Sequence, residues 1–192
     1  MKIDILKRKE SIIITAIEIL SQTGINGMTT KEIAKRQNIS EPAIYRYYNG
    51  KREIIKEIFR RFSNYDEVIK NTIKDNAMDG KEAIRYFCRT YAEYYQNYPE
   101  ITTVMFSFDT FKYDEETNEE MKNIIKNRYD LLLGIVEKAI ETKEISFNNN
   151  VEALTDSIFS ILWAITFLWR MENCSFDVKE RILLAVDNII NF

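Results

Sequence analysis

The residues best suited to a chemical task lie between Thr29 and Lys51, where about three residues separate two short helical patterns. In the second pattern Ile44 and Tyr48 are four residues apart, so both can face a core. The side chains left to face outward are those of Pro42, Ala43, Tyr45 and Arg46. Groups suited to binding phosphate lie nearby, on Thr30, Ser40, Tyr47 and Lys51. This arrangement predicts a helix-turn-helix that binds double-stranded DNA.

Arg46 is the side chain of this segment best suited to distinguish one base pair from another. Its guanidinium can donate to both O6 and N7 of guanine, and Ala43 beside it can contact the methyl group of thymine. Lys51 lies at a helix start, where free backbone amides also favour anions. We assign no base contact to Glu41, because phosphate would repel a carboxylate that pointed outward.

The composition excludes the common catalytic and metal-binding arrangements. The chain has no histidine, which removes Ser-His-Asp and Cys-His nucleophiles and histidine-based zinc sites. Its two cysteines, Cys88 and Cys174, lie far apart in sequence, and we expect two buried thiols. We expect the acidic residues from Asp114 to Glu120 to form a solvated helix start, not a metal site. The expectation is a protein that is not an enzyme and holds no metal or cofactor.

Three helices should hold the segment from Thr29 to Lys51. Apolar residues at every third or fourth position predict a helix over 4–22, which Gly24 ends in a left-handed conformation. Thr29 and Glu32 predict a capping box for a second helix that ends near residue 37. Asn38 tolerates a positive φ in the turn, and Ser40 should cap a third helix over 41–48.

The rest of the chain is also predicted to be helical. Five Gly and two Pro are too few for the many tight turns of a sandwich or barrel. The further helices are predicted over residues 51–76, 83–97, 100–108, 116–142, 151–171 and 177–190. The predicted fold class is therefore all-α, with about nine helices.

Residues 12–58 resemble the N-terminal DNA-binding domain of the TetR family of transcriptional regulators. The matching pieces are the helix end at Gly24, Met28-Thr29-Thr30 before Ile33-Ala34, Ile39-Ser40, Ile44-Tyr45-Arg46-Tyr47-Tyr48, and Lys51 followed by Ile54. The resemblance implies a helix-turn-helix head in residues 1–50, joined by a long helix to a helical effector-binding and dimerisation domain in residues 51–192. It further implies a homodimeric repressor that a small effector releases from a palindromic operator.

Aromatic residues beyond the head have two possible roles. Tyr91, Tyr94, Tyr95 and Tyr98 form one helical stripe, which most simply belongs to a core or its rim. The alternative is a largely apolar effector pocket with a few polar contacts. Its candidate lining is Tyr91, Tyr94, Tyr95, Phe106, Trp163 and Phe167.

The segment 151–171 is apolar on almost every side, so it needs cover on two of them. One cover can be the core and the other a second subunit, which the resemblance implies for the last two long helices. The candidate interface residues are Ile158, Ile161, Leu162, Ile165, Ile182, Val186 and Ile189. The alternative is the centre of a monomeric bundle.

Charge is distributed unevenly along the chain. Up to Phe62 there are 13 Lys and Arg against 7 Asp and Glu, the remainder has 14 against 23, and the whole carries a net charge of −3. A basic head joined to an acidic body suggests that only the first third meets a polyanion. The alternative function is a helical ligand-binding or scaffolding protein without specific DNA recognition.

We expect a cytoplasmic protein that does not engage membranes. The longest apolar run, 158–169, is shorter than the roughly 20 residues of a membrane span. The first ten residues mix apolar and charged side chains, unlike a signal peptide.

Overall fold

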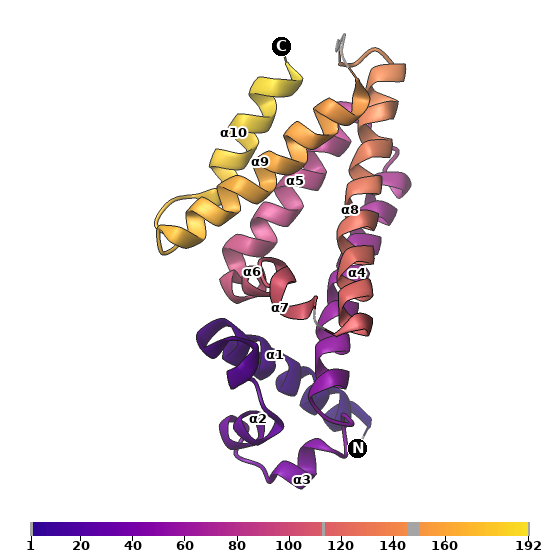
Figure 1. Ribbon diagram of the computed structural model, residues 1–192. Helices are drawn as coiled ribbons and strands as arrows, with labels where there is room; N and C mark the ends of the chain where they lie inside the picture. Colours follow the sequence, from indigo (N-terminus) through magenta and orange to yellow (C-terminus); the bar gives the residue numbers. More distant parts are fainter. Residues whose placement is uncertain (1, 113, 146–149, 192) are drawn as a thin grey trace. The chain divides into compact units, whose positions relative to one another are not determined.

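The computed structural model describes residues 2–112, 114–145 and 150–191. The helices of the first half are α1 (Lys2–Gly27), α2 (Thr30–Arg36), α3 (Glu41–Ile44), α4 (Lys51–Asp75) and α5 (Gly80–Asn97). Those of the second half are α6 (Pro99–Met105), α7 (Phe108–Phe111), α8 (Glu115–Glu141), α9 (Val151–Met171) and α10 (Val178–Ile190) (Figure 1). The predicted all-α fold is confirmed: the described ranges hold ten helices, instead of about nine, and no strand.

By packing, the chain divides into two compact units. Unit 1 comprises residues 1–63 and 100–124, and unit 2 comprises residues 64–99 and 125–192. The boundary falls inside the continuous helices α4 and α8. Because the units follow packing and not chain order, the domain division at residue 50 stays a prediction.

The core of unit 1 is built from α1, α2, α3 and the first half of α4. Helix α1 packs on α2, and α2 packs on α3. Each of these helices contributes fully buried isoleucines, among them Ile13, Ile33, Ile44 and Ile54. Gly24 has a φ of +69°, so the regular part of α1 ends there, as predicted. This core fixes α2 and α3 in place.

Two predicted helices end well before the predicted residue. Helix α3 ends at Ile44, because the chain continues in tighter turns in which the Tyr47 N–H donates to the Ile44 carbonyl at 2.9 Å. The predicted helix over 100–108 ends at Met105, and α7 follows it. The Ser107 carbonyl begins the new turn by accepting from the Thr110 N–H at 2.8 Å.

In unit 2, α10 packs on both α5 and α9. At the start of α5, Gly80 lies against α8, where a Cβ on Gly80 would be 2.3 Å from the Cβ of Ala139. Glycine is therefore required for this close approach. Cys88 is buried, as predicted, but Cys174 is only half-buried, because it lies in the turn after α9 with a φ of +59°.

Helix α9 buries one side and exposes apolar residues on another. Leu154, Ile158 and Leu162 are buried, whereas Phe167 is 49% and Met171 is 66% exposed. By length and composition alone, this helix of 21 residues is long and apolar enough to cross a membrane, and only 28% of its apolar window is buried. The apolar run 158–169 is shorter than this helix, because further apolar residues, such as Leu154 and Met171, lie on both sides of the run. A helix that packs against a partner subunit is likewise apolar along its length and only partly buried within its own chain.

Candidate functional site

Helices α2 and α3 form a helix-turn-helix within unit 1. The hydroxyl of Thr29 caps α2 by accepting from the Glu32 N–H at 3.1 Å. In the turn, Asn38 has a φ of +52°, as predicted, and the Ile39 N–H donates to the Ala34 carbonyl at 3.0 Å. These local bonds set the angle between the two helices.

Helix α2 is also fixed to α1 by its C-cap residue, Gln37. Gln37 accepts a hydrogen bond from the Ser11 hydroxyl at 2.8 Å through Oε1. Its amide nitrogen donates to the Thr15 hydroxyl oxygen at 2.6 Å. Since Gln37 is the residue that caps α2, these bonds brace the turn against α1 before any ligand binds.

The segment after the turn presents the side chains expected to contact bases. Ile44 and Tyr48 are buried, which confirms that they face the core. Pro42, Tyr45 and Arg46 are exposed, and Ala43 is half-buried. Arg46 has no ion pair among the described residues, so its guanidinium is available to an external acceptor.

The four predicted phosphate contacts lie in three different environments. Ser40 is exposed and Tyr47 half-buried, and the Ser40 hydroxyl makes no capping hydrogen bond, contrary to prediction. Thr30 is only 9% exposed, and its hydroxyl donates to Glu41 Oε1 at 2.6 Å. Lys51 donates from Nζ to the Ile25 carbonyl, and partial burial lowers the pKa of its amine.

The bond to Thr30 gives Glu41 a structural role that the sequence left undefined. Its carboxylate joins the first turn of α2 to the first turn of α3 across the helix-turn-helix. A carboxylate held in this way is directed toward the protein, which explains how an acid is tolerated beside the outward face of Arg46.

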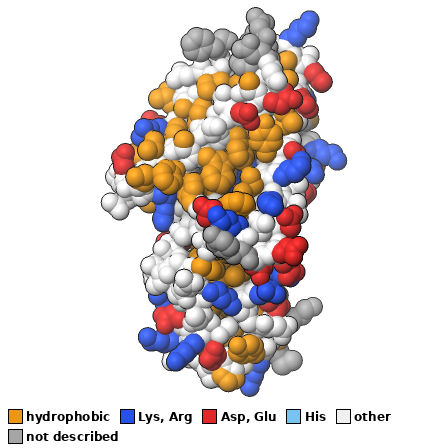
Figure 2. Space-filling model, in the orientation of Figure 1, with side chains coloured by type: hydrophobic (Ala, Val, Ile, Leu, Met, Phe, Trp, Pro, Cys, Tyr) orange, Lys and Arg blue, Asp and Glu red, His pale blue; other side chains and the backbone are white. Residues whose placement is uncertain are grey.

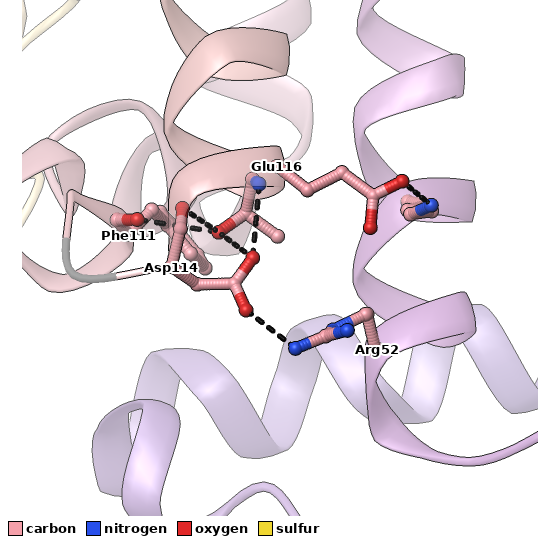
Figure 3. Close-up of polar contacts among 6 residues, drawn as sticks. Arg52, Phe111, Asp114 and Glu116 are labelled. Atoms are coloured by element: carbon pink, nitrogen blue, oxygen red, sulfur yellow. Dashed lines mark hydrogen bonds and ion pairs between the residues drawn. The ribbon is translucent and has the colours of Figure 1, made fainter.

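Several other cations of unit 1 form ion pairs with acids. Arg52 binds Asp114 at 2.7 Å, and Lys56 binds Glu116 (Figure 3). Asp114 also accepts from the Thr117 N–H at 3.1 Å, and this bond, with Arg52, lowers the pKa of its carboxyl. Further pairs join Arg61 to Glu10, Arg60 to Glu57 and Arg36 to Glu32. Asp114 and Glu116 lie outside the residues counted from the sequence, so they offset part of the positive excess, while Lys31 and Arg46 remain exposed.

Unit 2 contains a buried polar cluster that sequence reasoning missed. Arg128 donates to Asp66 Oδ1 from Nη2 at 2.9 Å and from Nε at 3.2 Å. The Tyr91 hydroxyl donates to the same oxygen, and Arg128 Nη1 donates to the Tyr95 hydroxyl at 3.1 Å. Burial raises the pKa of the Asp66 carboxyl, and Arg128 opposes that shift. A charged residue in an apolar helical register, as Arg128 is in α8, is the signal that would have found the cluster.

A cavity of about 610 Å³ adjoins this cluster, between α4, α5 and α8. Its apolar lining consists of Ile73, Met78, Ala83, Leu131, Gly134 and Ile135. Its polar lining consists of Asp66, Glu67, Lys70, Asn127, Asp130 and Lys138. Within the described ranges, no group of three or more His, Cys, Asp or Glu is arranged to hold a metal ion.

None of the six residues predicted to line an effector pocket lines this cavity. Tyr91 and Tyr95 are fully buried in the polar cluster, and Tyr94 stacks on Tyr65 at 4.3 Å between ring centroids. Trp163 packs near Phe159 on α9. Phe167 is largely exposed, and Phe106 belongs to unit 1. Helical spacing grouped the tyrosines, but it does not indicate which aromatic side chains face an opening.

The seven predicted interface residues divide between core and surface. Four of them are buried within unit 2: Ile158, Leu162, Ile182 and Val186. The other three are half-buried: Ile161, Ile165 and Ile189. The most exposed apolar residues of α9 and α10 are Phe167, Leu168, Met171 and Leu184. Figure 2 shows a band of hydrophobic side chains over these helices.

Comparison with known proteins agrees with the geometry of unit 1. Residues 12–58 match the family model of the "Bacterial regulatory proteins, tetR family". The chain is 32% identical over 85 residues to the class D tetracycline repressor of Escherichia coli, a match that covers 40% of this chain and only 39% of that protein. It is 22% identical over 180 residues to the fatty acid metabolism regulator of Bacillus subtilis, covering 93% and 89% of the two chains.

A solved structure has the same fold over nearly the whole length. It is the transcriptional regulator FadR from Bacillus subtilis in complex with stearoyl-CoA. Its TM-score is 0.79 at 19% sequence identity, with 94% of this chain and 97% of that chain covered. Similarity at this identity establishes the fold of the chain.

The braced helix-turn-helix and its outward-facing arginine define a DNA-binding protein. Residues 12–58 form a helix-turn-helix domain of the TetR family of bacterial transcriptional regulators.

Proposed function

We propose that this regulator is a homodimeric repressor that binds a palindromic operator and is released by a small, largely apolar effector. The observation that carries the DNA contact is Arg46, which is exposed at the helix-turn-helix and has no ion pair among the described residues. One such segment in each subunit would enter successive major grooves of a two-fold symmetric site.

A gel shift with the DNA upstream of its own gene tests the operator. We expect a specific complex that unlabelled palindrome displaces and random duplex does not. The logarithm of the binding constant should fall by several units per unit of log salt, since each neutralised phosphate contributes about −0.9. A salt slope near zero, or no specific complex, would support the alternative of a ligand-binding or scaffolding protein without DNA recognition.

The exposed apolar face of α9 and α10 supports the dimer. Phe167, Leu168, Met171 and Leu184 are each more than 40% exposed, and a patch of this kind marks an interaction surface. We expect Leu168→Glu with Leu184→Glu to convert the dimer to a monomer, as measured by light scattering. The matched control is Ala153→Glu, at an exposed position near the start of α9. An unchanged mass in the double variant would exclude this face.

The effector is supported by the cavity between α4, α5 and α8 and by one structural relative. FadR from Bacillus subtilis, which shares this fold, was solved with stearoyl-CoA bound. A cavity of about 610 Å³ is within the usual range for small-molecule sites. A thermal-shift screen of acyl-CoA esters and other apolar compounds should find a ligand that also dissociates the operator complex. A compound that raises the melting temperature without affecting the complex would not be the effector.

We also propose a cytoplasmic location, since a regulator must meet chromosomal DNA. The apolar composition of α9 then serves subunit contact and not membrane insertion. We expect the protein to stay in the supernatant when a lysate is centrifuged at high speed, and recovery with the membranes would contradict this.

A further inference from the structure

The cavity wall of unit 2 contains a carboxylate that is only half satisfied. Oδ1 of Asp66 accepts from the Tyr91 hydroxyl and from both Nε and Nη2 of Arg128. Oδ2 of the same carboxylate is buried and accepts no hydrogen bond from the described residues. Asp66 as a whole is only 8% exposed, and it is one of the residues that line the cavity.

A buried acceptor without a donor is costly, so its presence in a cavity wall points to a missing partner. Arg128 already neutralises the charge of Asp66, since its guanidinium donates twice to that carboxylate. What the site lacks is therefore one hydrogen bond and not a counter-ion. An uncharged donor would supply it without burying a further charge.

The charged side chains that line the cavity do not donate a hydrogen bond to Oδ2 of Asp66. Lys70 pairs with Glu67 at 3.7 Å, and Lys138 donates to the Met78 carbonyl at 3.0 Å. Asp130 pairs with Lys126, which lies outside the cavity. Both lysines of the lining thus have other acceptors.

Gly134 lies on the solvent-exposed side of the cavity. It lies in the middle of α8, where glycine costs about 1 kcal/mol relative to alanine. A Cβ built on Gly134 would meet nothing within 4 Å, so packing inside the chain does not require glycine there. Its missing side chain enlarges the cavity on the side of α8.

We propose that this cavity binds an apolar molecule that lies against Gly134 and donates a hydrogen bond from an uncharged amide N–H or hydroxyl group to Oδ2 of Asp66. The identification of this molecule with the effector rests on the proposed function. Binding itself does not, and it is measured without DNA.

Two matched pairs of probes test the donor. N-decylacetamide differs from decyl acetate by an N–H in place of an ester oxygen, and 1-dodecanol differs from dodecyl methyl ether by its O–H. We expect the full-length protein to bind one or both donors about tenfold more tightly than the matched compound, as measured by calorimetry, since a donor relieves an unpaired buried acceptor. Equal affinity within both pairs, as expected if a water already serves Oδ2, or no binding of any probe, would overturn the proposal.

Two variants locate the bound probe. Gly134→Leu fills the cavity and should reduce the affinity for the preferred donor at least tenfold, whereas Glu137→Leu, at an exposed site on α8 outside the lining, should not change it. Asp66→Asn keeps an oxygen for Tyr91 and Arg128 but replaces Oδ2 by an amino group that cannot accept. The preference for the donor should then fall below twofold, with the affinity of the matched compound unchanged.

If Asp66→Asn does not fold, the affinities of the matched probes for the natural protein and for Gly134→Leu still test the proposal. Affinity unchanged by Gly134→Leu would overturn the proposal. Failure of the gel shift with intact donor preference would instead reject only the proposed repressor function.

Discussion

The two units use their polar side chains in opposite ways. In unit 1 the side chains assigned to DNA, such as Tyr45 and Arg46, lie on the surface next to helices fixed by local bonds. In unit 2 Asp66 and Arg128 are buried and bonded to each other across 62 positions of sequence. We therefore propose that function depends in unit 1 on Arg46, a cation free at the surface, and in unit 2 on Oδ2 of Asp66, an unpaired oxygen in the interior.

The largest effect should come from breaking the buried pair. We expect Arg128→Met to lower the free energy of unfolding by about 3–5 kcal/mol, because it leaves the Asp66 carboxylate buried without its cation. Urea unfolding measures this loss. The double variant Asp66→Asn with Arg128→Met should recover part of it, since no buried charge remains. A loss below about 1 kcal/mol would show that the pair is not the main polar link of unit 2.

The next largest effect should be on DNA binding and not on stability. Arg46→Ala should weaken operator binding by about 1–3 kcal/mol and relax selectivity at one base pair, because a bidentate contact to guanine is lost. Fluorescence anisotropy with single-substituted operators measures both. Arg89→Ala, at an exposed arginine of α5, is the control and should bind as the natural protein does. Equal losses of operator affinity for both variants would show that Arg46 does not recognise a base.

A smaller effect should follow from the charge of Glu41. Glu41→Gln keeps an oxygen for the Thr30 hydroxyl but removes a negative charge near the phosphates. We expect tighter operator binding at low salt, by less than about 1 kcal/mol, with no difference at high salt. Weaker binding would mean that Glu41 contacts a base. Unfolding in urea should be unchanged if the bond to Thr30 is preserved.

The smallest effect should be a pH dependence at Asp114. Its carboxyl has a lowered pKa in the folded chain, so its contribution to stability is present above its ordinary pKa and is lost as pH falls through the folded value. Asp114→Asn should therefore be less stable than the natural protein near neutral pH. Plots of melting temperature against pH for the two proteins should converge in acid. Curves that stay parallel at all pH values would exclude the carboxylate as the cause.

Much of unit 1 could be predicted from the sequence because its signals are local. The cap at Thr29, the left-handed residues Gly24 and Asn38 and the buried Ile44 each follow from residues within a few positions. The ion pairs of Arg52 and Lys56 could not be predicted, since their acids lie about 60 positions away. Counting charges therefore overstated the free positive surface.

In unit 2 the sequence predicted the helices but not which faces meet. Apolar spacing is the same for a residue that covers a partner and for one in the core, so Ile158 and Met171 could not be separated. Tyr91 and Tyr95 were grouped correctly as a stripe, but their hydroxyl partners come from α4 and α8. Only the packing of the three helices brings Arg128 to Asp66, which lines the cavity.

The most direct test of the DNA-binding claim is a salt titration of operator affinity with the natural protein and Arg46→Ala side by side. We expect two chains for each palindromic duplex, a steep negative dependence on log salt for both proteins, and weaker, less selective binding by Arg46→Ala at every salt concentration. Affinity that does not change with salt, or is the same for the palindrome and a scrambled duplex, would contradict it.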